Sequence, residues 1–286
     1  MSRKYFFVSD IHSHYTPLVT ALHENGFDEN NQDHILCVLG DVFDRGKETL
    51  QLYNYLTSLP KERLILIRGN HELLYNQLLN DVFPRKGDFD NGTVRTFCQI
   101  AGVDERYIDT HYWIVQAVVE GVSSKELSKY IKAPSNYWKQ VIERVAQSEI
   151  TQWINSNDWV NYLETPHYIF VHSFIPLQQR LIDARHVEDV GFREDWRNAT
   201  QTEWEDAMWG CPWSAFKMGW NQTGKTIVCG HWSTDDFFKN LTTKASKEDI
   251  KKCNLFKSTK YNVIALDAAT VATGRINVLV LDEDEL

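Results

Sequence analysis

Cysteine is scarce and unpatterned in this sequence. The 286-residue chain has five cysteines, which are odd in number and scattered, and no two of them form a C-x-x-C pair. A disulfide-stapled secreted domain would be expected to carry an even number of regularly spaced cysteines. A reducing location, which we take to be the cytoplasm, is therefore the simpler expectation.

Long apolar runs are missing as well. No stretch approaches the roughly 20 apolar residues that a helix needs to span a bilayer. The chain begins MSRKYFFVSD, basic and then apolar, but the apolar run stops at Ser9 and is too short for a signal peptide. We therefore expect no membrane partner, and we interpret residues 4–9 as a first β-strand.

Positive charge is in deficit. The chain carries 30 Lys and Arg against 39 Asp and Glu, which gives a formal net charge of -9. A surface that coats nucleic acid is basic, so we expect no such partner, although a local cationic pocket is still allowed. The charged fraction of 24% and the hydrophobic fraction of 43% are those of a globular chain, long enough for one large domain or two small ones.

The N-terminal part of the chain, up to Asn80, alternates short apolar strands with helices. The strands are apolar throughout rather than at every second residue, which is typical of a parallel sheet buried on both faces. Thr16 and Pro17 are suited to the start of the first helix, which continues to Gly26. We expect strands at residues 4–9, 34–40 and 63–68, and helices at residues 16–26, 47–59 and 72–80.

The rest of the chain is organised differently. Residues 135–156 carry apolar side chains at helical spacing. We interpret residues 85–165, approximately, as a helical cap inserted into a single domain that spans residues 1–286. Strands are expected again further on, at 167–172 and 226–231, followed by 261–267 and 275–282 as a closing antiparallel pair.

Polar side chains gather where the apolar strands end. The motifs D-x-H, GDVFDRG and RGNHE follow the first three strands, and single histidines follow two later strands. Because the carboxyl ends of parallel strands share one edge of a sheet, where ligands bind, we expect these five segments to meet. In chain order they supply Asp10, His12, Asp41, Asp44, Arg45, Arg68, Asn70, His71, His172 and His231.

Six of these side chains form a candidate metal-binding set. Imidazole and oxygen ligands without thiolate suit Mn²⁺ first, with Fe or Zn²⁺ as alternatives, better than Ca²⁺. Six groups are too many for one tetrahedral site, so two divalent ions that share one carboxylate are the economical solution. Two ions about 3.5–4 Å apart can hold a hydroxide between them and clamp a phosphate ester. The candidate ligands are Asp10, His12, Asp41, Asn70, His172 and His231.

The remaining motif residues suit phosphate chemistry. Arg45 and Arg68 lie in loops beside candidate ligands, where a guanidinium can bind two phosphate oxygens at once. His71 follows a candidate ligand and is placed to act as an acid, and Asp44 could orient its ring and keep it cationic. That pair would protonate the leaving oxygen of a phosphate ester.

Taken in order, the motifs D-x-H, GDxxDRG and GNHE and the two isolated histidines resemble the calcineurin-like metallophosphoesterases. The likeness is greatest to the phosphoprotein phosphatase branch, which includes small bacterial and phage serine/threonine phosphatases and symmetrical diadenosine tetraphosphate hydrolases. It covers residues 5–72 closely and residues 167–282 more loosely. It implies an α/β fold, the metallophosphoesterase four-layer α/β/β/α sandwich, here with the inserted helical cap, and a dinuclear metal centre.

The resemblance also implies a role for every motif residue. One metal would be held by the D-x-H pair, the other by an amide and the isolated histidines, and one aspartate would bridge them. The matches are Asp10 and His12 for the first metal, Asp41 for the bridge, Asn70, His172 and His231 for the second metal, Arg45 and Arg68 for phosphate, and His71 with Asp44 for the acid.

Two positions depart from the family pattern, and one residue is left without a role. Ser13 stands where the family usually has Gly, so its side chain could crowd or hydrogen-bond near the metals. Cys211 aligns loosely with an arginine that reaches the substrate phosphate in relatives, so phosphate affinity could differ. His14 shares the spacing of Asp10 and His12 but has no place in the ligand set.

We expect the protein to be a metal-dependent phosphatase that hydrolyses phosphate monoesters of phosphoproteins or small phosphoesters. A symmetrical dinucleoside polyphosphate hydrolase is an alternative that the fold equally permits. A non-catalytic, metal-binding interaction scaffold is a third hypothesis. The full ligand set and the intact Asp44 and His71 pair argue against the scaffold, which has no need of them.

Overall fold

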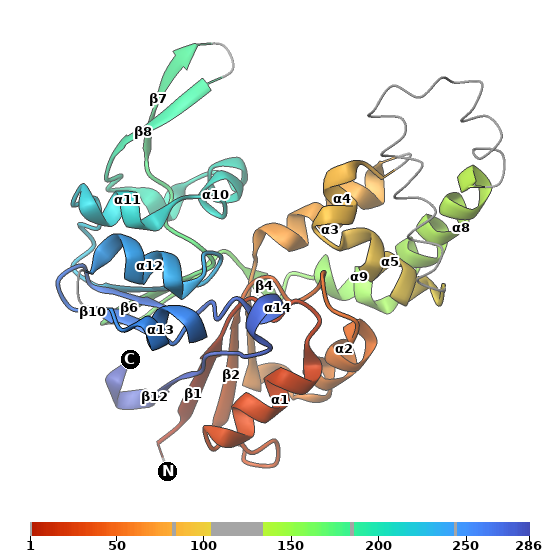
Figure 1. Ribbon diagram of the computed structural model, residues 1–286, viewed down its shortest axis with the longest axis horizontal. Coiled ribbons are helices and arrows are strands. Elements are labelled where there is room, and N and C mark those ends of the chain that lie inside the picture. The colour runs from red at the N-terminus through yellow and green to blue at the C-terminus, as the bar shows by residue number, and fades with distance from the viewer. Residues whose placement is uncertain (1, 82–83, 104–133, 184–185, 243–244) are drawn as a thin grey trace.

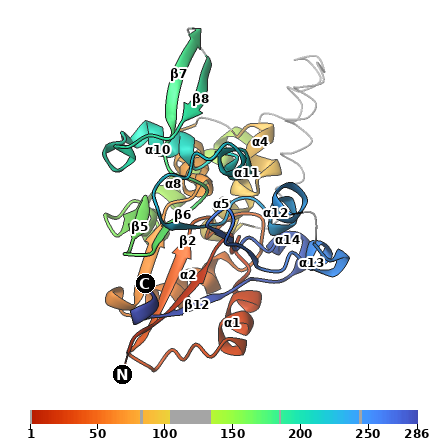
Figure 2. The same ribbon diagram turned by 90° about the vertical axis from the view of Figure 1, so that its left-hand side faces the viewer.

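Two five-stranded β-sheets form the centre of this computed structural model (Figure 1). The structure describes residues 2–81, 84–103, 134–183, 186–242 and 245–286. Helices flank the two sheets on their outer faces, and a two-stranded hairpin projects away from them (Figures 1 and 2).

The first sheet has the strand order β12-β1-β2-β3-β4. Strands β1 to β4 run parallel, and β12 pairs antiparallel with β1. The alternation of strands and helices that we predicted up to Asn80 is confirmed, and the observed boundaries lie close to the expected ones. The elements are β1 (Lys4–Val8), α1 (Tyr15–Glu24), β2 (His34–Leu39), α2 (Thr49–Ser58), the 3₁₀ turn Lys61–Arg63, β3 (Leu64–Ile67), α3 (Asn70–Asn80), β4 (Trp159–Val160) and β12 (Leu279–Asp282).

The second sheet has the strand order β10-β11-β9-β6-β5. Strands β6, β9 and β11 are parallel neighbours, and β5 and β10 are antiparallel edges. The predicted strands at 167–172 and 226–231 are therefore confirmed as β6 and β9. The elements are β5 (Tyr162–Glu164), β6 (Tyr168–Val171), β9 (Thr226–Cys229), β10 (Phe256–Ser258) and β11 (Val263–Ala265).

The predicted antiparallel pair of 261–267 with 275–282 is wrong. Strand β11, from the first segment, lies inside the second sheet, whereas β12, from the second segment, is an edge of the first sheet. Every residue of β11 is buried, which suits an interior strand, whereas β12 alternates buried and half-buried residues, which suits an edge. Both segments are apolar in sequence, so only the tertiary structure shows that they belong to different sheets.

The two sheets pack face to face through a continuous apolar layer. Phe7 of β1 stacks on Phe170 of β6 with ring centroids 4.0 Å apart and ring planes at 3°. Buried side chains of α1, α2 and α3 cover the outer face of the first sheet, and those of α10 (Gln201–Ala207), α11 (Pro212–Lys217) and α12 (Thr234–Leu241) cover the second. The four-layer α/β/β/α sandwich is thereby confirmed.

The middle of the chain contributes more helices to the outer face of the first sheet. Phe97 lies between Tyr75 of α3 and Trp138, with ring centroids 4.8 Å and 6.1 Å away. Residues 104–133 of the predicted insert are outside the described residues, while its last residues include β4 and β5, so the inserted cap stays a proposal. The described helices of this part are α4 (Lys86–Asp90), α5 (Thr93–Ala101), α8 (Pro134–Ala146) and α9 (Glu149–Ile154).

The remaining elements are a hairpin, two short helices and two 3₁₀ turns. No described helix is both long and apolar enough to cross a bilayer. A separate hairpin of two antiparallel strands stands apart from both central sheets (Figure 2). These elements are the hairpin β7 (Gln178–Asp183) and β8 (His186–Gly191), α13 (Lys247–Lys252), α14 (Thr270–Thr273) and the 3₁₀ turns Trp196–Asn198 and Glu283–Glu285.

The stacking of Phe7 on Phe170 predicts that truncation of one ring will destabilise the folded protein strongly. Phe170→Ala leaves a cavity where both sheets meet, and we expect the free energy of unfolding to fall by about 3–5 kcal/mol. Met218→Ala is the control, because this side chain is 66% exposed and its loss should change stability by no more than about 0.5 kcal/mol. Urea unfolding measures both, and equal effects would contradict the packing described.

Candidate metal centre

The loops that follow five strands converge at one edge of the two sheets. The backbone N–H of Asp10, after β1, donates to the carbonyl of Gly40, after β2, at 3.2 Å. The N–H of Gly230, after β9, donates to the carbonyl of His172, after β6, at 2.7 Å. The N–H of His231 donates to the carboxylate of Asp10, so the segments from the two sheets that carry candidate ligands are bonded to one another.

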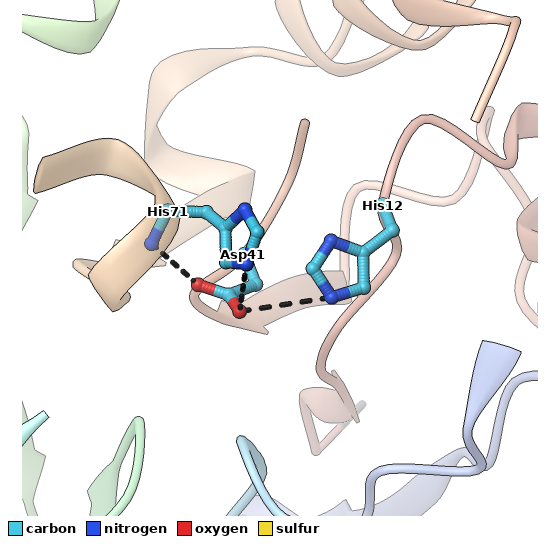
Figure 3. A group of neighbouring side chains, drawn as sticks. All are labelled: His12, Asp41 and His71. Carbon is cyan, nitrogen blue, oxygen red and sulfur yellow. Dashed lines mark hydrogen bonds and ion pairs between the residues drawn. The ribbon is translucent and has the colours of Figure 1, made fainter. Parts of the chain in front are cut away.

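The carboxylate of Asp41 lies at the middle of this convergence. Its Oδ1 accepts the backbone N–H of His71 at 3.0 Å and lies 3.4 Å from Nε2 of His172. Its Oδ2 lies 3.7 Å from Nε2 of His12 and 3.9 Å from Nε2 of His71 (Figure 3). One buried carboxylate thus faces imidazoles from three other segments.

Two groups of side chains share this carboxylate. Within each group the potential ligand atoms all lie within 4.8 Å of one another, close enough to bind one ion. The described part of the chain therefore brings together two candidate ion positions that have one ligand in common. The groups are His12, Asp41 and His71, and Asp41, His172 and His231.

Hydrogen bonds fix which nitrogen of each ring is free. Nδ1 of His12 donates to the carbonyl of Phe43 at 3.0 Å, and Nδ1 of His172 donates to the carbonyl of Leu39 at 2.8 Å. Each Nε2 therefore keeps its lone pair. Nε2 of His172 lies 2.8 Å from Oδ1 of Asn70, so two atoms with lone pairs face each other, as ligands of one cation do.

Asp10 has an oxygen without a partner. Its Oδ2 accepts the backbone N–H of His231 at 2.9 Å, whereas its Oδ1 is buried and has no hydrogen-bond partner. Burial, and after it the charge of Asp267, raises the pKa of Asp10 well above its usual value. An orphaned buried oxygen of this kind fits a metal ligand, since a cation would supply the missing partner.

Two of the histidines, His12 and His231, are disposed to be neutral. Burial, and after it His172, lowers the pKa of His231 to about 3, and burial also lowers the pKa of His12 well below its usual value. Only the neutral ring can bind a metal, so both rings are in the form that a ligand requires. The donor set therefore fits divalent ions held by imidazole and oxygen ligands.

His71 is bonded differently from the other histidines. Its Nδ1 donates to Oδ2 of Asp44 at 2.7 Å, and its Nε2 accepts from the guanidinium of Arg45 at 3.0 Å. Burial favours the neutral ring, but the carboxylates of Asp41 and Asp44 outweigh it and raise the pKa of His71 above its usual value. The predicted acid and its partner are thus in contact.

Arg45 opens onto the same space as the ligands. It lines a cavity of about 290 Å³ together with His12 and His231, and this cavity also reaches Asp267. Its guanidinium is therefore available to an anion that approaches the candidate ion positions. A phosphate-binding role for Arg45 stays a prediction.

Arg68 is placed differently. Its guanidinium donates to the carbonyls of Ile154 and Ser156, at 3.2 Å and 3.3 Å, near the end of α9. It lines another cavity, beside Gly69, and does not line the one that holds Arg45. A phosphate-binding role for Arg68 stays a prediction.

Ser13 and Cys211, which depart from the family pattern, each lie close to a neighbouring hydroxyl group. Ser13 has φ +56°, in the left-handed region that favours glycine, and its buried hydroxyl is 2.8 Å from that of Thr49 in α2. It therefore points to a helix start and away from the ligands. Cys211 is exposed, with Sγ 3.5 Å from the hydroxyl of Ser214. His14 donates to a carbonyl of its own turn, at 3.2 Å.

Backbone strain is concentrated at this site. Ten described residues other than glycine have a left-handed φ, and seven of them carry or adjoin the predicted site residues. Each such residue costs roughly 1–3 kcal/mol unless its surroundings enforce the conformation, and such strain typically gathers at functional sites. The seven are Asp10, His12, Ser13, Asp41, Asp44, Arg45 and His231.

Glu72 holds the loops after β2 and β3 together. Its carboxylate accepts the backbone N–H groups of Gly69, Asp41 and Val42, at 2.7 Å, 3.1 Å and 3.0 Å. Its place three residues after Gly69, at the start of α3, is that of a capping acid, which the sequence shows. Its hydrogen bonds to Asp41 and Val42 could not be predicted from the sequence and are seen only in the structure.

Three further side chains at the site have no motif in the sequence. Asp267, after β11, lines the cavity of Arg45, and burial raises its pKa to about 7. The buried hydroxyls of Thr93 and Thr96 in α5 both donate to the carboxylate of Asp44. An aspartate directly after an apolar strand was a usable signal for Asp267, whereas nothing marked the two threonines.

The family follows from comparison of the sequence with known proteins. The sequence profile of the calcineurin-like phosphoesterases matches residues 3–241. This chain belongs to that family. The resemblance that we drew from the motifs is thereby confirmed at the level of the family.

Individual relatives of this calcineurin-like phosphoesterase match over shorter stretches or in fold alone. Segments of 68 residues are 35% and 38% identical to two symmetrical bis(5'-nucleosyl)-tetraphosphatases, and each match covers 24% of this chain and 24% of the relative. The chain thus spans about a quarter of the length of these relatives, which come from Buchnera aphidicola of Acyrthosiphon pisum (strain Tuc7) and of Schizaphis graminum (strain Sg). The cold-active protein-tyrosine phosphatase of a psychrophilic Shewanella species has a TM-score of 0.50 at 16% identity, covering 99% of this chain and 76% of that one.

The shared carboxylate predicts the effect of one substitution on metal binding. Asp41→Asn keeps the shape of the side chain but removes the charge common to both ligand groups, so we expect the affinity for Mn²⁺ to fall by at least about 100-fold. Isothermal titration measures this, with Asp282→Asn at the edge of β12 as the control. Unchanged stoichiometry and affinity in Asp41→Asn would contradict the assignment.

Proposed function

We propose that this protein is a dinuclear metal-dependent phosphoesterase that hydrolyses phosphate monoesters in the manner of serine/threonine protein phosphatases. The observation that supports it most is the arrangement around Asp41, which belongs to two candidate ligand groups at once. His71, a member of the first group, is bonded to Asp44 and Arg45, so we assign it to the acid and not to an ion. The candidate ligands, acid and anion-binding group lie close together, which supports phosphate ester hydrolysis.

The ligand set indicates which residues would hold the ions. Mn²⁺ is the first choice for imidazole and oxygen ligands, with Fe or Zn²⁺ as alternatives. When bound, two such ions supply a nucleophile from water at neutral pH and neutralise phosphate charge. The proposed ligands are Asp10, His12 and Asp41 for one ion, and Asp41, Asn70, His172 and His231 for the other.

The protein's own groups would complete the reaction. Arg45 binds the phosphate oxygens, and in doing so its guanidinium leaves Nε2 of His71 free. Once Arg45 has left it, Nε2 of His71 takes up a proton from solvent, which the carboxylates of Asp41 and Asp44 favour. The oxygen of a water molecule forms a bond to phosphorus and gives one proton to solvent, and the bond from phosphorus to the leaving oxygen breaks. The leaving oxygen takes the proton from Nε2 of His71, while Asp44 holds the opposite nitrogen of the ring. No phosphorylated side chain is needed.

The charge of the cleft beside the site supports a phosphopeptide over a polyphosphate. A cleft of about 800 Å³ is lined by Gly69, next to the candidate ligand Asn70, and by Met208. The carboxylate of Glu72 is turned into the loops after β2 and β3, but the other three carboxylates still outnumber the two guanidinium groups. The cleft is therefore slightly acidic and disfavours a tetraphosphate relative to a neutral or basic peptide. The charged residues that line it are Glu72, Asp81, Asp88, Glu205, Arg68 and Arg85.

A symmetrical dinucleoside polyphosphate hydrolase is the second candidate function. It is favoured by the 35–38% identical segments shared with symmetrical bis(5'-nucleosyl)-tetraphosphatases, although these cover only 24% of each chain. A non-catalytic scaffold is the third candidate, and the complete ligand and acid sets speak against it. The cytoplasmic location and the absence of a nucleic-acid partner stay predictions from composition.

A comparison of two substrates separates the first two functions. With Mn²⁺ present, we expect kcat/KM for a phosphoserine peptide to exceed that for diadenosine tetraphosphate by at least about tenfold, because the acidic cleft disfavours the polyphosphate. Steady-state phosphate release and nucleotide chromatography measure the two rates. The opposite order would replace the first function with the second, and no turnover of either would favour the scaffold.

The proposed acid predicts a loss of turnover when His71 is replaced. In His71→Asn we expect kcat on the phosphoserine peptide to fall by about 100-fold or more, within the range that general acids contribute. His23→Asn is the matched control, because this exposed ring near the end of α1 pairs with Glu29 and is not among the residues of the site. Equal activity of the two variants would rule out His71 as the acid.

A further inference from the structure

Two threonines of α5 donate hydrogen bonds to the carboxylate of Asp44, the partner of His71. The hydroxyl of Thr93 donates to Oδ2 of Asp44 at 2.7 Å, and that of Thr96 donates to Oδ1 at 2.8 Å. The hydroxyl of Thr96 also accepts the backbone N–H of Asp44 at 3.0 Å. All three residues are buried, with at most 1% of their surface exposed.

These bonds leave the Asp44 carboxylate a single orientation. Oδ2 accepts from both Thr93 and Nδ1 of His71, and Oδ1 accepts from Thr96. Rotation of the carboxylate would break two bonds from α5 at once, in a place where water does not replace them. The orientation of the His71 ring is fixed as well, because its Nδ1–H donates to an oxygen that cannot move.

The same helix also fixes the residue next to Asp44. A side chain at Gly92 would come within 2.3 Å of the backbone N of Arg45, so the chain before α5 packs directly on that loop. Arg95 donates to the carbonyl of Arg45 at 2.7 Å, and Gln99 donates to that of Gly46 at 3.0 Å. The start of α5 is therefore shaped to the left-handed turn that carries Asp44 and Arg45.

We propose that Thr93 and Thr96 are positioning residues for the Asp44 and His71 pair. This inference rests on the proposed function, in which His71 protonates the leaving oxygen. The two hydroxyls hold Asp44, and Asp44 aims Nε2 of His71 at that oxygen. Neither threonine touches the substrate or an ion, so their loss impairs leaving-group protonation and leaves substrate binding intact.

The leaving group of the substrate separates positioning from general damage. The alkoxide of phosphoserine is a poor leaving group that needs a proton, whereas p-nitrophenolate leaves without one. In Thr93→Val and Thr96→Val we expect kcat on a phosphoserine peptide to fall about 10- to 100-fold, the usual effect of losing a supporting hydrogen bond. On p-nitrophenyl phosphate kcat should fall by less than about threefold, with KM unchanged for both substrates.

Two further variants make the test specific. Thr93→Ser and Thr96→Ser keep the hydroxyl and should restore the rate on the peptide. Thr151→Val is the matched control, because Thr151 is another buried helix threonine, whose hydroxyl is 2.6 Å from that of Tyr75. It should lower stability without any dependence on the leaving group. Equal losses on both substrates, or no rescue by serine, would overturn the proposal.

A spectroscopic readout keeps the test independent of turnover. The buried proton between Nδ1 of His71 and Asp44 should give a downfield proton resonance that is absent in His71→Asn. We expect Thr93→Val and Thr96→Val to shift or broaden it and Thr151→Val to leave it in place. An unchanged resonance in both site variants would overturn the proposal, whether or not the wild type is active. A wild type that turned over neither substrate would contradict only the proposed function.

Discussion

A single buried carboxylate, that of Asp41, is the constraint on which the site depends. Burial alone would raise its pKa, but the imidazoles of His172, His71 and His12 in their charged form outweigh burial, so the net pKa lies well below its usual value. An ionised carboxylate in such a place needs partners of positive charge, and rings in the neutral form that binds a metal do not supply it. Divalent ions between Asp41 and these rings would complete the balance.

The geometry around that carboxylate depends on backbone that other residue types could not easily form. Gly40 has φ +87°, and a side chain there would come within 2.6 Å of Nδ1 of His172. A side chain on Gly69 would come within 2.3 Å of Oδ1 of Asp41, so both glycines are needed for close approach. The rigid double sheet below, with Phe7 stacked on Phe170, holds these strained loops in place.

The sequence predicted the parts of the molecule in which one short segment carries both a strand and the candidate ligands at its end. Apolar runs that end in Asp41 or in Asn70 and His71 gave both the strands and the candidate ligands, because parallel strands present their ends at one edge. The pairing of β11 with β12 was wrong, since two apolar strands near the C-terminus carry no mark of which sheet they join. The placement of Arg68 against α9 depended equally on tertiary packing. Thr93 and Thr96 were missed because a helix threonine looks the same in sequence whether it faces solvent or a buried carboxylate.

The central claim is that two ions share Asp41, and anomalous diffraction from crystals grown with Mn²⁺ tests it most directly. The account predicts two anomalous peaks about 3.5–4 Å apart, both in contact with the Asp41 carboxylate. One of them should also contact Asp10 and His12, and the other His172 and His231. A single peak, or two peaks of which one does not touch Asp41, would contradict the account.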